Sequence, residues 1–411
     1  MNNNEDESKL VRRESCQQNE FILQNNNFAN FKDFQKYSLE NLINIELKFN
    51  ETSLGQKINL FTSAISRCKN LQSLNSQFRR NGINGKSFFD LMTGLQNCQS
   101  LVSINLDLEG NRIFKDIPLS FRNIAVKWEN LNQMSLNFKQ NKIQPYDLPN
   151  FQFIFQNLKN LSELEILLSQ NQINERVTFH LFSSLLNCSN INSLVIDLSE
   201  NPINVGNQNL QLGISHLAKL KNLFKLKMDF SQISWFTPKY IEKNRIINFA
   251  NEISYLKSIS EFTLNLDYLN FQRQSAVIAP ALVNNYNLRR LEINIRECFS
   301  LYSKPIKTIF EFFELCRYLS QCKSLQQLTI QFNNAYTFLI NEKNLSEEQK
   351  SQLLNLASVF RQFKGIRVLR IILKLTNERN NYQIQSNIFL QSKIKMSVKK
   401  MPRLVSFQIS Y

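Results

Sequence analysis

Few residues in this chain have the type and spacing that catalysis requires. The sequence has 411 residues, with seven cysteines and only two histidines, His180 and His216. Two histidines exclude most histidine-based metal sites and catalytic triads, and we expect both to lie on the flanks of helices. A phosphate-binding loop is not indicated, because Gly82 and Gly85 stand in a short NGING turn that no GK[ST] sequence follows.

Glu163 and Glu165 are the residues whose spacing is most similar to that of a catalytic acid–base pair. Their spacing places both carboxylates on the same side of an expected strand. The surrounding sequence implies no pocket that could hold a substrate between them, so we interpret the pair as part of a solvated binding face. We therefore predict that the protein is not an enzyme and that it uses no cofactor and no metal ion.

A repeated pattern of apolar residues organises most of the chain. Each copy starts with an apolar residue, here called the opening residue, and continues with apolar residues three, five and seven positions later. Asparagine follows ten positions after the opening residue in the regular copies. The opening residues are Leu42, Leu71, Leu101, Leu131, Leu161, Ile191, Leu223, Ile259, Leu288, Leu325, Ile366 and Leu404. Their spacing is 30 residues from Leu71 to Ile191 and varies between 29 and 41 beyond it.

The alternation of apolar residues in each copy predicts a short, half-buried strand. Between strands, Phe88, Leu91, Met92 and Leu95 have the spacing of one helix face. One such unit cannot bury its apolar face alone, so stacked copies are expected to form a parallel sheet with helices on one side. The asparagine at the exit of the strand is expected to satisfy backbone groups of a buried turn.

This pattern, LxxLxLxLxxNxI with helices between the strands, resembles the leucine-rich repeat family in its ribonuclease-inhibitor-like class. The resemblance covers roughly residues 37–411 and implies an α/β solenoid of about twelve repeats. Such a solenoid is a curved horseshoe with the parallel sheet on its concave face and helices on its convex face. Residues 37–222 keep the regular period, whereas residues 223–411 form longer, irregular repeats without the asparagine. Residues 1–36 are expected to be a polar, largely disordered segment with a short capping helix.

Four cysteines share one position of the repeat. Cys68, Cys98, Cys188 and Cys322 stand three residues before an opening residue, where Trp128 and other apolar residues stand in further copies. We interpret them as buried thiols at the ends of helices, held in separate layers that cannot share a metal. The odd cysteine count, the lack of an apolar leader and the lack of a membrane-spanning segment favour a reducing, intracellular location in the cytoplasm.

The net charge of +16 invites a nucleic-acid or membrane hypothesis. However, the positions two, four, six and eight after the opening residues, which should form the concave surface, hold ten acidic and nine basic residues. A basic stripe interleaved with aromatic residues, which is typical of nucleic-acid binding, is not apparent. We therefore expect a protein partner, and consider nucleic acids and small molecules unfavoured as ligands.

The charges of the expected concave surface are unevenly distributed. The repeats that open at residues 101, 161 and 191 contribute acidic side chains and no basic ones, which suggests an acidic patch bordered by two lysines; unrelated surface charges are the alternative. The loop 234–238 adds an aromatic residue that either contacts a partner or packs locally. The candidate partner-binding residues are Asp107, Glu109, Glu163, Glu165, Asp197, Lys225, Lys227, Asp229 and Trp235.

The sequence thus predicts a non-catalytic scaffold or adaptor that binds a protein through its concave sheet face. The alternatives are a structural subunit of a large intracellular assembly, a regulator of a small GTPase or nuclease and, less favoured, a nucleic-acid-binding protein. The expected last strand has no helix after it before Tyr411. A partner could cover this edge, a second copy could pair with it, or the strand could be frayed.

Overall fold

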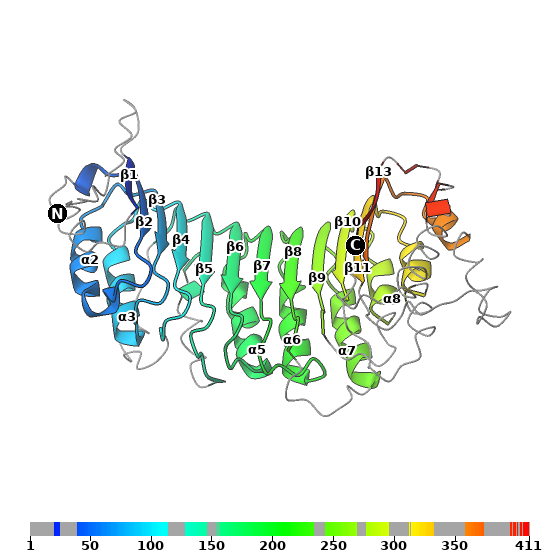
Figure 1. Cartoon of the computed structure of the whole chain (residues 1–411), viewed down its shortest axis with the longest axis horizontal. Helices are drawn as coiled ribbons and strands as arrows, with labels where there is room; N and C mark the ends of the chain where they lie inside the picture. Colours follow the sequence, from blue (N-terminus) through cyan, green and yellow to red (C-terminus); the bar gives the residue numbers. More distant parts are fainter. Residues whose placement is uncertain are drawn as a thin grey trace, which may run out of the picture. The chain divides into compact units, whose positions relative to one another are not determined.

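The computed structural model describes residues 20–24, 39–113, 128–145, 154–155, 157–233, 243–268, 277–295, 312, 314–332, 358–373, 395–396, 398–399, 401, 403–404 and 406–410. The chain forms two compact units, residues 1–173 with 180–197 and residues 174–179 with 198–411. The capping helix and most of the N-terminal segment expected from the sequence lie outside the described residues. In both units, short parallel strands alternate with turns and helices (Figure 1).

The sheet of the first unit is built from consecutive parallel strands. They are β1 (Glu20–Gln24), β2 (Asn44–Lys48), β3 (Ser73–Gln77), β4 (Ser103–Asp107), β5 (Gln133–Asn137), β6 (Glu163–Leu167) and β7 (Ser193–Asp197). Each strand pairs with the next one in the chain. The described helices are α2 (Ile58–Ile65) and α3 (Gly85–Leu95), with short 3-10 turns η1 (Leu39–Asn41), η2 (Leu54–Gln56) and η5 (Leu185–Asn187). Helix α5 (Glu175–Ser184) contains residues of both units.

The second unit repeats this arrangement. Its strands are β8 (Lys225–Asp229), β9 (Glu261–Asn265), β10 (Arg290–Asn294), β11 (Gln327–Phe332), β12 (Val368–Leu373) and β13 (Ser406–Ser410). They are parallel and pair in sequence order. The helices are α6 (Gln208–Leu217), α7 (Lys243–Ser254) and α8 (Ile278–Val283).

The twelve strands predicted from the repeat are confirmed, and each begins two residues after its opening residue. Strand β1 is an additional strand that the repeat pattern did not predict. It pairs with β2 in a register that places Phe21 opposite Ile45 and Leu23 opposite Leu47. Because β1 occupies the edge of β2, it satisfies backbone groups that a first repeat would otherwise expose.

The buried asparagines form a hydrogen-bonded ladder between neighbouring turns, as the sequence predicted. The Asn171 side-chain oxygen accepts hydrogen bonds from the backbone N–H groups of Asn141 (2.9 Å) and Ile143 (3.1 Å). Its amide nitrogen donates to the carbonyl oxygens of Phe138 (3.0 Å) and Leu168 (2.8 Å). Corresponding bonds between repeats are made by Asn81, Asn111 and Asn141.

A left-handed residue precedes the asparagine position in eight consecutive repeats. Nine positions after the opening residue, φ lies between 51° and 70° at Glu51, Arg80, Gly110, Gln140, Gln170, Glu200, Gln232 and Tyr268. This backbone conformation turns the chain away from the sheet, and it is unfavourable for every residue type except glycine and, less so, asparagine and aspartate. In seven of the eight repeats, a non-glycine residue therefore adopts a backbone conformation that only glycine adopts without strain.

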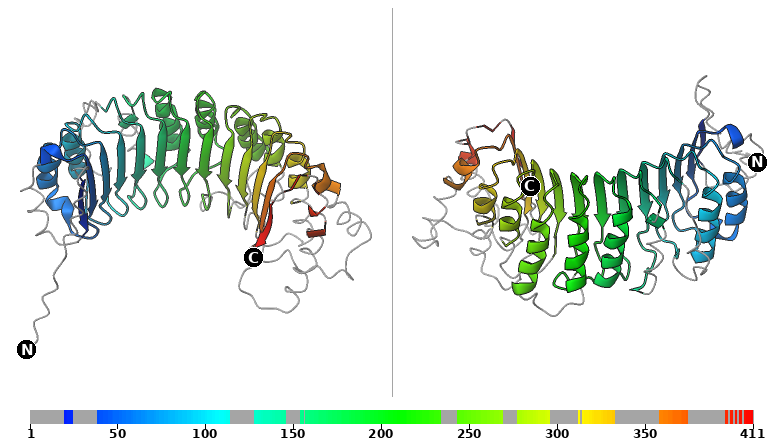
Figure 2. Two further views of the ribbon diagram at one scale, coloured as in Figure 1. Left: turned by 90° about the horizontal axis from the view of Figure 1, so that it is seen from above. Right: turned by 180° about the vertical axis from the view of Figure 1, so that it is seen from behind.

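The helices cover one face of each sheet and leave the other uncovered (Figure 2). Phe88, Leu91, Met92 and Leu95 of α3 are buried, as their spacing predicted. In the second unit Phe230 and Phe249 pack edge to face, with ring centroids 5.8 Å apart. We call the uncovered side of each sheet the open face; it is formed by the residues two, four, six and eight positions after each opening residue.

Candidate protein-binding site on the open face

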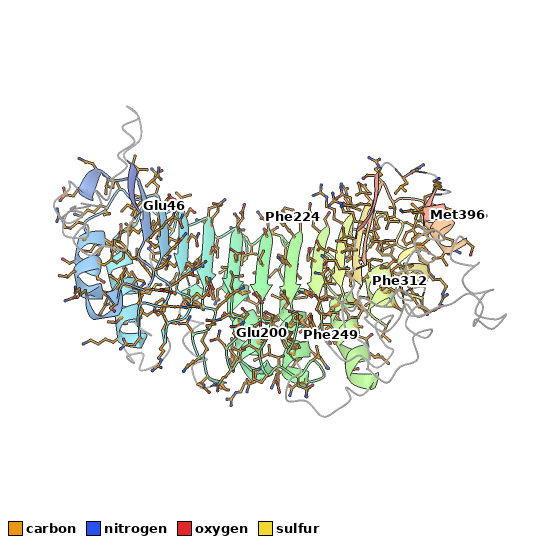
Figure 3. All side chains as sticks on the ribbon, viewed as in Figure 1. Glu46, Glu200, Phe224, Phe249, Phe312 and Met396 are labelled. Atoms are coloured by element: carbon orange, nitrogen blue, oxygen red, sulfur yellow. The ribbon has the colours of Figure 1, made fainter. Side chains whose placement is uncertain are left out.

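The open face presents side chains from a backbone that is fixed by parallel pairing. Within each strand the burial alternates, so that the apolar residues point to the helices and the intervening residues point outward. Figure 3 shows these side chains, with Glu46 labelled on β2; its carboxylate lies 2.9 Å from the ammonium group of Lys48. The predicted site residues can therefore be located one by one, except Trp235, which lies outside the described residues.

The first group of predicted site residues surrounds Asp107 on β4. The guanidinium of Arg79 donates to the Asp107 carboxylate at 2.6 Å and lies 3.8 Å from Glu109. The side-chain amide of Asn137 donates to Asp107 at 2.9 Å and to Glu109 at 3.4 Å. The hydrogen bond that Arg79 donates to Asp107, together with the nearby acidic charge, raises the pKa of Arg79. Asp107 and Glu109 are thus partly neutralised by the preceding repeat.

Asp107 also has a structural task at the end of its strand. Its carboxylate accepts a hydrogen bond from the backbone N–H of Glu109 at 3.3 Å. In the second unit Asp229 accepts in the same way from Ser231 at 2.9 Å. An acidic or amide side chain at this position therefore closes the turn after the strand. This role in the turn explains why such residues recur at this position, without any contact with a binding partner.

The second group lies on β6 and β7. Glu163 is exposed, and Glu165 is half-buried and accepts a hydrogen bond from the hydroxyl of Ser135 at 2.7 Å. Asp197 forms an ion pair of 2.8 Å with the ammonium group of Lys139. Glu163 and Glu165 are consequently the acidic groups of β6 and β7 for which the described residues provide no ion-pair partner.

Two apolar side chains on the same strands were not among the predicted site residues. Leu167 and Val195 are both half-buried on the open face. In the strand register Val195 lies beside Glu165, and Leu167 lies beside Asp197. Their positions in the repeat assign both residues to the open face, so the sequence could have indicated them. They were missed because the site residues on these strands were chosen by charge.

The remaining predicted residues belong to the second unit. Lys225 and Lys227 are exposed on β8, where Lys225 lies beside Glu261 of β9. Asp229 accepts a hydrogen bond from the side-chain amide of Asn265 at 2.8 Å. The structure thus groups these three residues on one strand of the second unit, while the acidic candidates from Asp107 to Asp197 belong to the first unit.

The cysteine positions are buried, and they contain hydrogen-bond donors. The thiol of Cys98 donates to the carbonyl oxygen of Ile65 in the preceding repeat at 3.3 Å, and that of Cys188 to Phe155 at 3.6 Å. The indole of Trp128, which occupies the equivalent position, donates to Leu95 at 3.0 Å. Each of these carbonyl groups also accepts a backbone N–H from the residue three positions later, so the side-chain donor adds a second hydrogen bond between repeats.

Burial also decides the chemistry of these thiols. It raises the pKa of Cys68, Cys98 and Cys188 to about 12 and that of Cys322 to about 11, so that they remain protonated near neutral pH. The five described cysteines are free and buried. In the described part of the chain, no group of three or more histidine, cysteine or acidic residues is placed to hold a metal ion.

Both histidines lie in helices. His216 lies 5.3 Å from Phe179, ring centre to ring centre, and its pKa is lowered by burial and by the charge of Lys219. His180 lies half-buried in α5.

Within the described residues, no helix combines the length and apolar character that crossing a membrane requires.

The parallel strands, the helices between them and the asparagine ladder define an α/β solenoid of leucine-rich repeats, as the sequence pattern predicted. No protein-family model matches the sequence, and no curated protein matches it. Among solved structures, this chain is similar to the leucine-rich repeat-containing protein LegL7 from Legionella pneumophila. The two are 13% identical, and the match covers 94% of this chain and 100% of that chain with a TM-score of 0.43.

Proposed function

We propose that this protein is a non-catalytic scaffold that binds a protein partner through the open face of its first unit, centred on β6 and β7. The observation that supports this proposal is the combination of half-buried Leu167 and Val195 with the carboxylates of Glu163 and Glu165. Apolar side chains surrounded by polar ones are the usual composition of a protein interface. The uncompensated carboxylates favour a partner with a basic surface.

The fixed geometry of this face favours binding. Glu165 is held by Ser135, and Asp197 is held by Lys139, so few side chains need to be ordered when a partner arrives. Strand β6 is paired on both sides, and β7 is paired with β6, which keeps the backbone in place. Such preorganisation lowers the entropic cost of association. The free, buried thiols favour a reducing compartment such as the cytoplasm.

The test is a pull-down from cell extract with the wild-type protein and two matched variants. Glu163→Lys/Glu165→Lys reverses both charges on the open face. Glu40→Lys/Glu129→Lys reverses two exposed charges elsewhere in the same unit and serves as the control. We expect a stoichiometric protein, captured in the presence of nuclease, to be lost with the first variant and retained with the second. Equal capture by all three proteins would contradict the proposed site.

The role of a structural subunit in a large assembly predicts a different result. A permanent subunit should enter a complex whose mass is independent of salt, because obligate interfaces are large and apolar. A scaffold that recognises a basic partner should release it as ionic strength rises. Light scattering of the captured complex at low and high salt therefore separates these two functions.

A further inference from the structure

The basic residues of the second unit concentrate at one edge of its sheet. We define the helix-to-strand edge as residues 217–224, 253–260, 282–289, 319–326, 360–367 and 398–405, which run from six positions before to one position after each opening residue. These segments contain eleven lysines and arginines and no aspartate or glutamate. The equivalent segments of the first unit contain five basic and two acidic residues. Ten of these eleven basic residues lie in the described part of the chain, so much of the net charge of +16 is located at a single edge.

Backbone hydrogen bonds align this edge into a regular row. The N–H of Ser260 donates to the carbonyl of Phe224, and the N–H of Arg289 donates to that of Ser260, both at 2.8 Å. The row continues through Gln326 to Arg367 at 2.8 and 2.7 Å. With neighbouring strands about 4.8 Å apart, these five positions span about 19 Å. An aromatic ring and two guanidinium groups therefore stand at fixed places along one line.

A second row, in which four of the five residues are lysines, runs beside the first. Two positions before the opening residues stand Lys221, Lys257, Tyr286, Lys323 and Lys364, and all five are exposed. In the part of the chain that the structure describes, none of these lysines forms an ion pair, and neither Arg289 nor Arg367 does. Cations placed side by side in register repel each other and attract a linear anion.

Exposed aromatic rings are interleaved with these cations. Phe224, Tyr255 and Tyr286 belong to the helix-to-strand edge and are 45%, 59% and 83% exposed. Phe224 is labelled in Figure 3 at the beginning of β8. Tyr268, also exposed, lies at the opposite edge, where its strand ends. Exposed aromatic rings are suited to stacking on flat ligands.

We propose that the helix-to-strand edge of the second unit binds single-stranded nucleic acid. The lysines and arginines contact the phosphates, and bases stack on Phe224, Tyr255 and Tyr286. A length of about 19 Å corresponds to about six stacked nucleotides at about 3.4 Å each. The sequence did not make this stripe apparent, because successive members of each row are 29 to 41 residues apart and come together only when the repeats are in register. An acidic peptide would use the cations but leave the rings without a role.

The test measures binding of a fluorescently labelled 20-nucleotide oligouridine and oligothymidine to the full-length protein by anisotropy. The edge variant replaces Lys221, Arg289, Lys323 and Lys364 by glutamine. The control variant replaces Lys57, Lys86, Lys142 and Arg176, which are exposed elsewhere, and removes the same net charge. A second pair compares Tyr286→Ser with Tyr268→Asn. Circular dichroism checks that each variant is folded.

We expect the edge variant to bind at least about tenfold more weakly than the control variant, with a flatter salt dependence by about 0.7 per lost phosphate contact. Tyr286→Ser should weaken binding about tenfold, while Tyr268→Asn should leave it unchanged. Equal losses in the edge and control variants would overturn the proposal. Full competition by polyglutamate, together with unchanged binding by Tyr286→Ser, would overturn it in favour of an acidic protein partner. This site is independent of the open face, so Glu163→Lys/Glu165→Lys should bind the oligonucleotides normally.

Discussion

The ammonium group of Lys139 lies 2.8 Å from a carboxylate oxygen of Asp197, although the repeat that contains β6 separates the repeats of these two residues. A long basic side chain therefore neutralises an acidic group two repeats away. The same occurs over one repeat between Arg79 and Asp107. The acidic area on the open face of the first unit is therefore smaller than a count of charges by repeat suggests, and it centres on Glu163 and Glu165.

Removing this internal compensation should strengthen the attraction for a basic partner. In Lys139→Gln, Asp197 loses its cation, and we expect the protein partner to bind about two- to fivefold more tightly at low salt. The free energy of unfolding should change by less than about 1 kcal/mol, because the ion pair is only partly buried. Titration calorimetry with the captured partner measures the first effect. Lys142→Gln, an exposed change beyond the strand, should affect neither quantity; equal affinities for both variants would contradict the role of Asp197.

The asparagine ladder should make a large contribution to stability. Asn171→Ala removes the acceptor for two backbone N–H groups and the donor for at least two carbonyl groups, all of them buried. We expect a loss of about 3 kcal/mol or more in the free energy of unfolding. Asn97→Ala, at an exposed position, should cost less than about 0.5 kcal/mol.

Urea denaturation can follow this loss in the first unit alone. The chain has two tryptophans, so in a Trp235→Phe background the buried Trp128 reports on its own unit. A similar small loss for Asn171→Ala and Asn97→Ala would show that water satisfies the turn as well as the amide does.

The left-handed turn position offers a stabilising substitution. Gln170 has φ = 57°, a conformation that costs a non-glycine residue about 1–2 kcal/mol. Gln170→Gly should therefore raise the free energy of unfolding, by up to about 1 kcal/mol after the greater chain entropy of glycine is deducted. Gln172→Gly, two residues later and outside the set of left-handed positions, should lower it. Thermal unfolding measures both, and a lower melting temperature for Gln170→Gly would refute the strain argument.

The buried thiols should be unreactive until the protein unfolds. In a Cys16→Ser/Cys298→Ser background the five remaining cysteines are those that are buried and free. At pH 8 we expect no reaction with Ellman's reagent in the native state and five thiols after denaturation, because burial holds the pKa of Cys188 near 12. An introduced cysteine at exposed Asn190 should react at once and serves as the positive control.

The same shift gives a pH dependence whose sign is fixed. The folded-state pKa of Cys188 lies above its ordinary value of 9.0, so the folded protein binds the thiol proton more tightly than the unfolded chain. This contribution to stability is fully present below pH 9 and decreases as the pH rises from 9 towards 12, by about 1.4 kcal/mol per unit for each such thiol. Cys188→Ala should show a shallower decline between pH 8 and pH 10 than its parent.

The fold could be predicted well because the repeat imposes the same physical requirement many times. Leu101, Ile104 and Leu106 and their equivalents must all point to the helices, and asparagine must occupy the one turn position with unpaired backbone groups. Strand β1 does not contain the repeat pattern: Glu20–Gln24 is short, and it can be recognised as part of the sheet only from its register with β2. Buried Asn285 also departs from the apolar cysteine position, and its amide donates to the carbonyl of Leu256 at 2.9 Å.

The candidate site was less predictable, because it depends on contacts between repeats. The sequence assigned Glu163 and Glu165 to the surface of the sheet, which follows from strand periodicity. It did not indicate that Arg79 reaches Asp107, since the conformation of a long side chain is not encoded in the repeat. The aligned edge from Phe224 to Arg367 likewise requires the register of strands whose spacing in sequence is irregular.

Photo-crosslinking from the open face is the most direct test of the central claim. A benzophenone amino acid placed at Val195, or at Ser193 on the same face of β7, should crosslink the captured protein partner. The same group at Leu186, exposed on η5 at the end of α5, should give no crosslink. Crosslinks from Leu186 with none from Val195 or Ser193 would contradict partner binding by the open face.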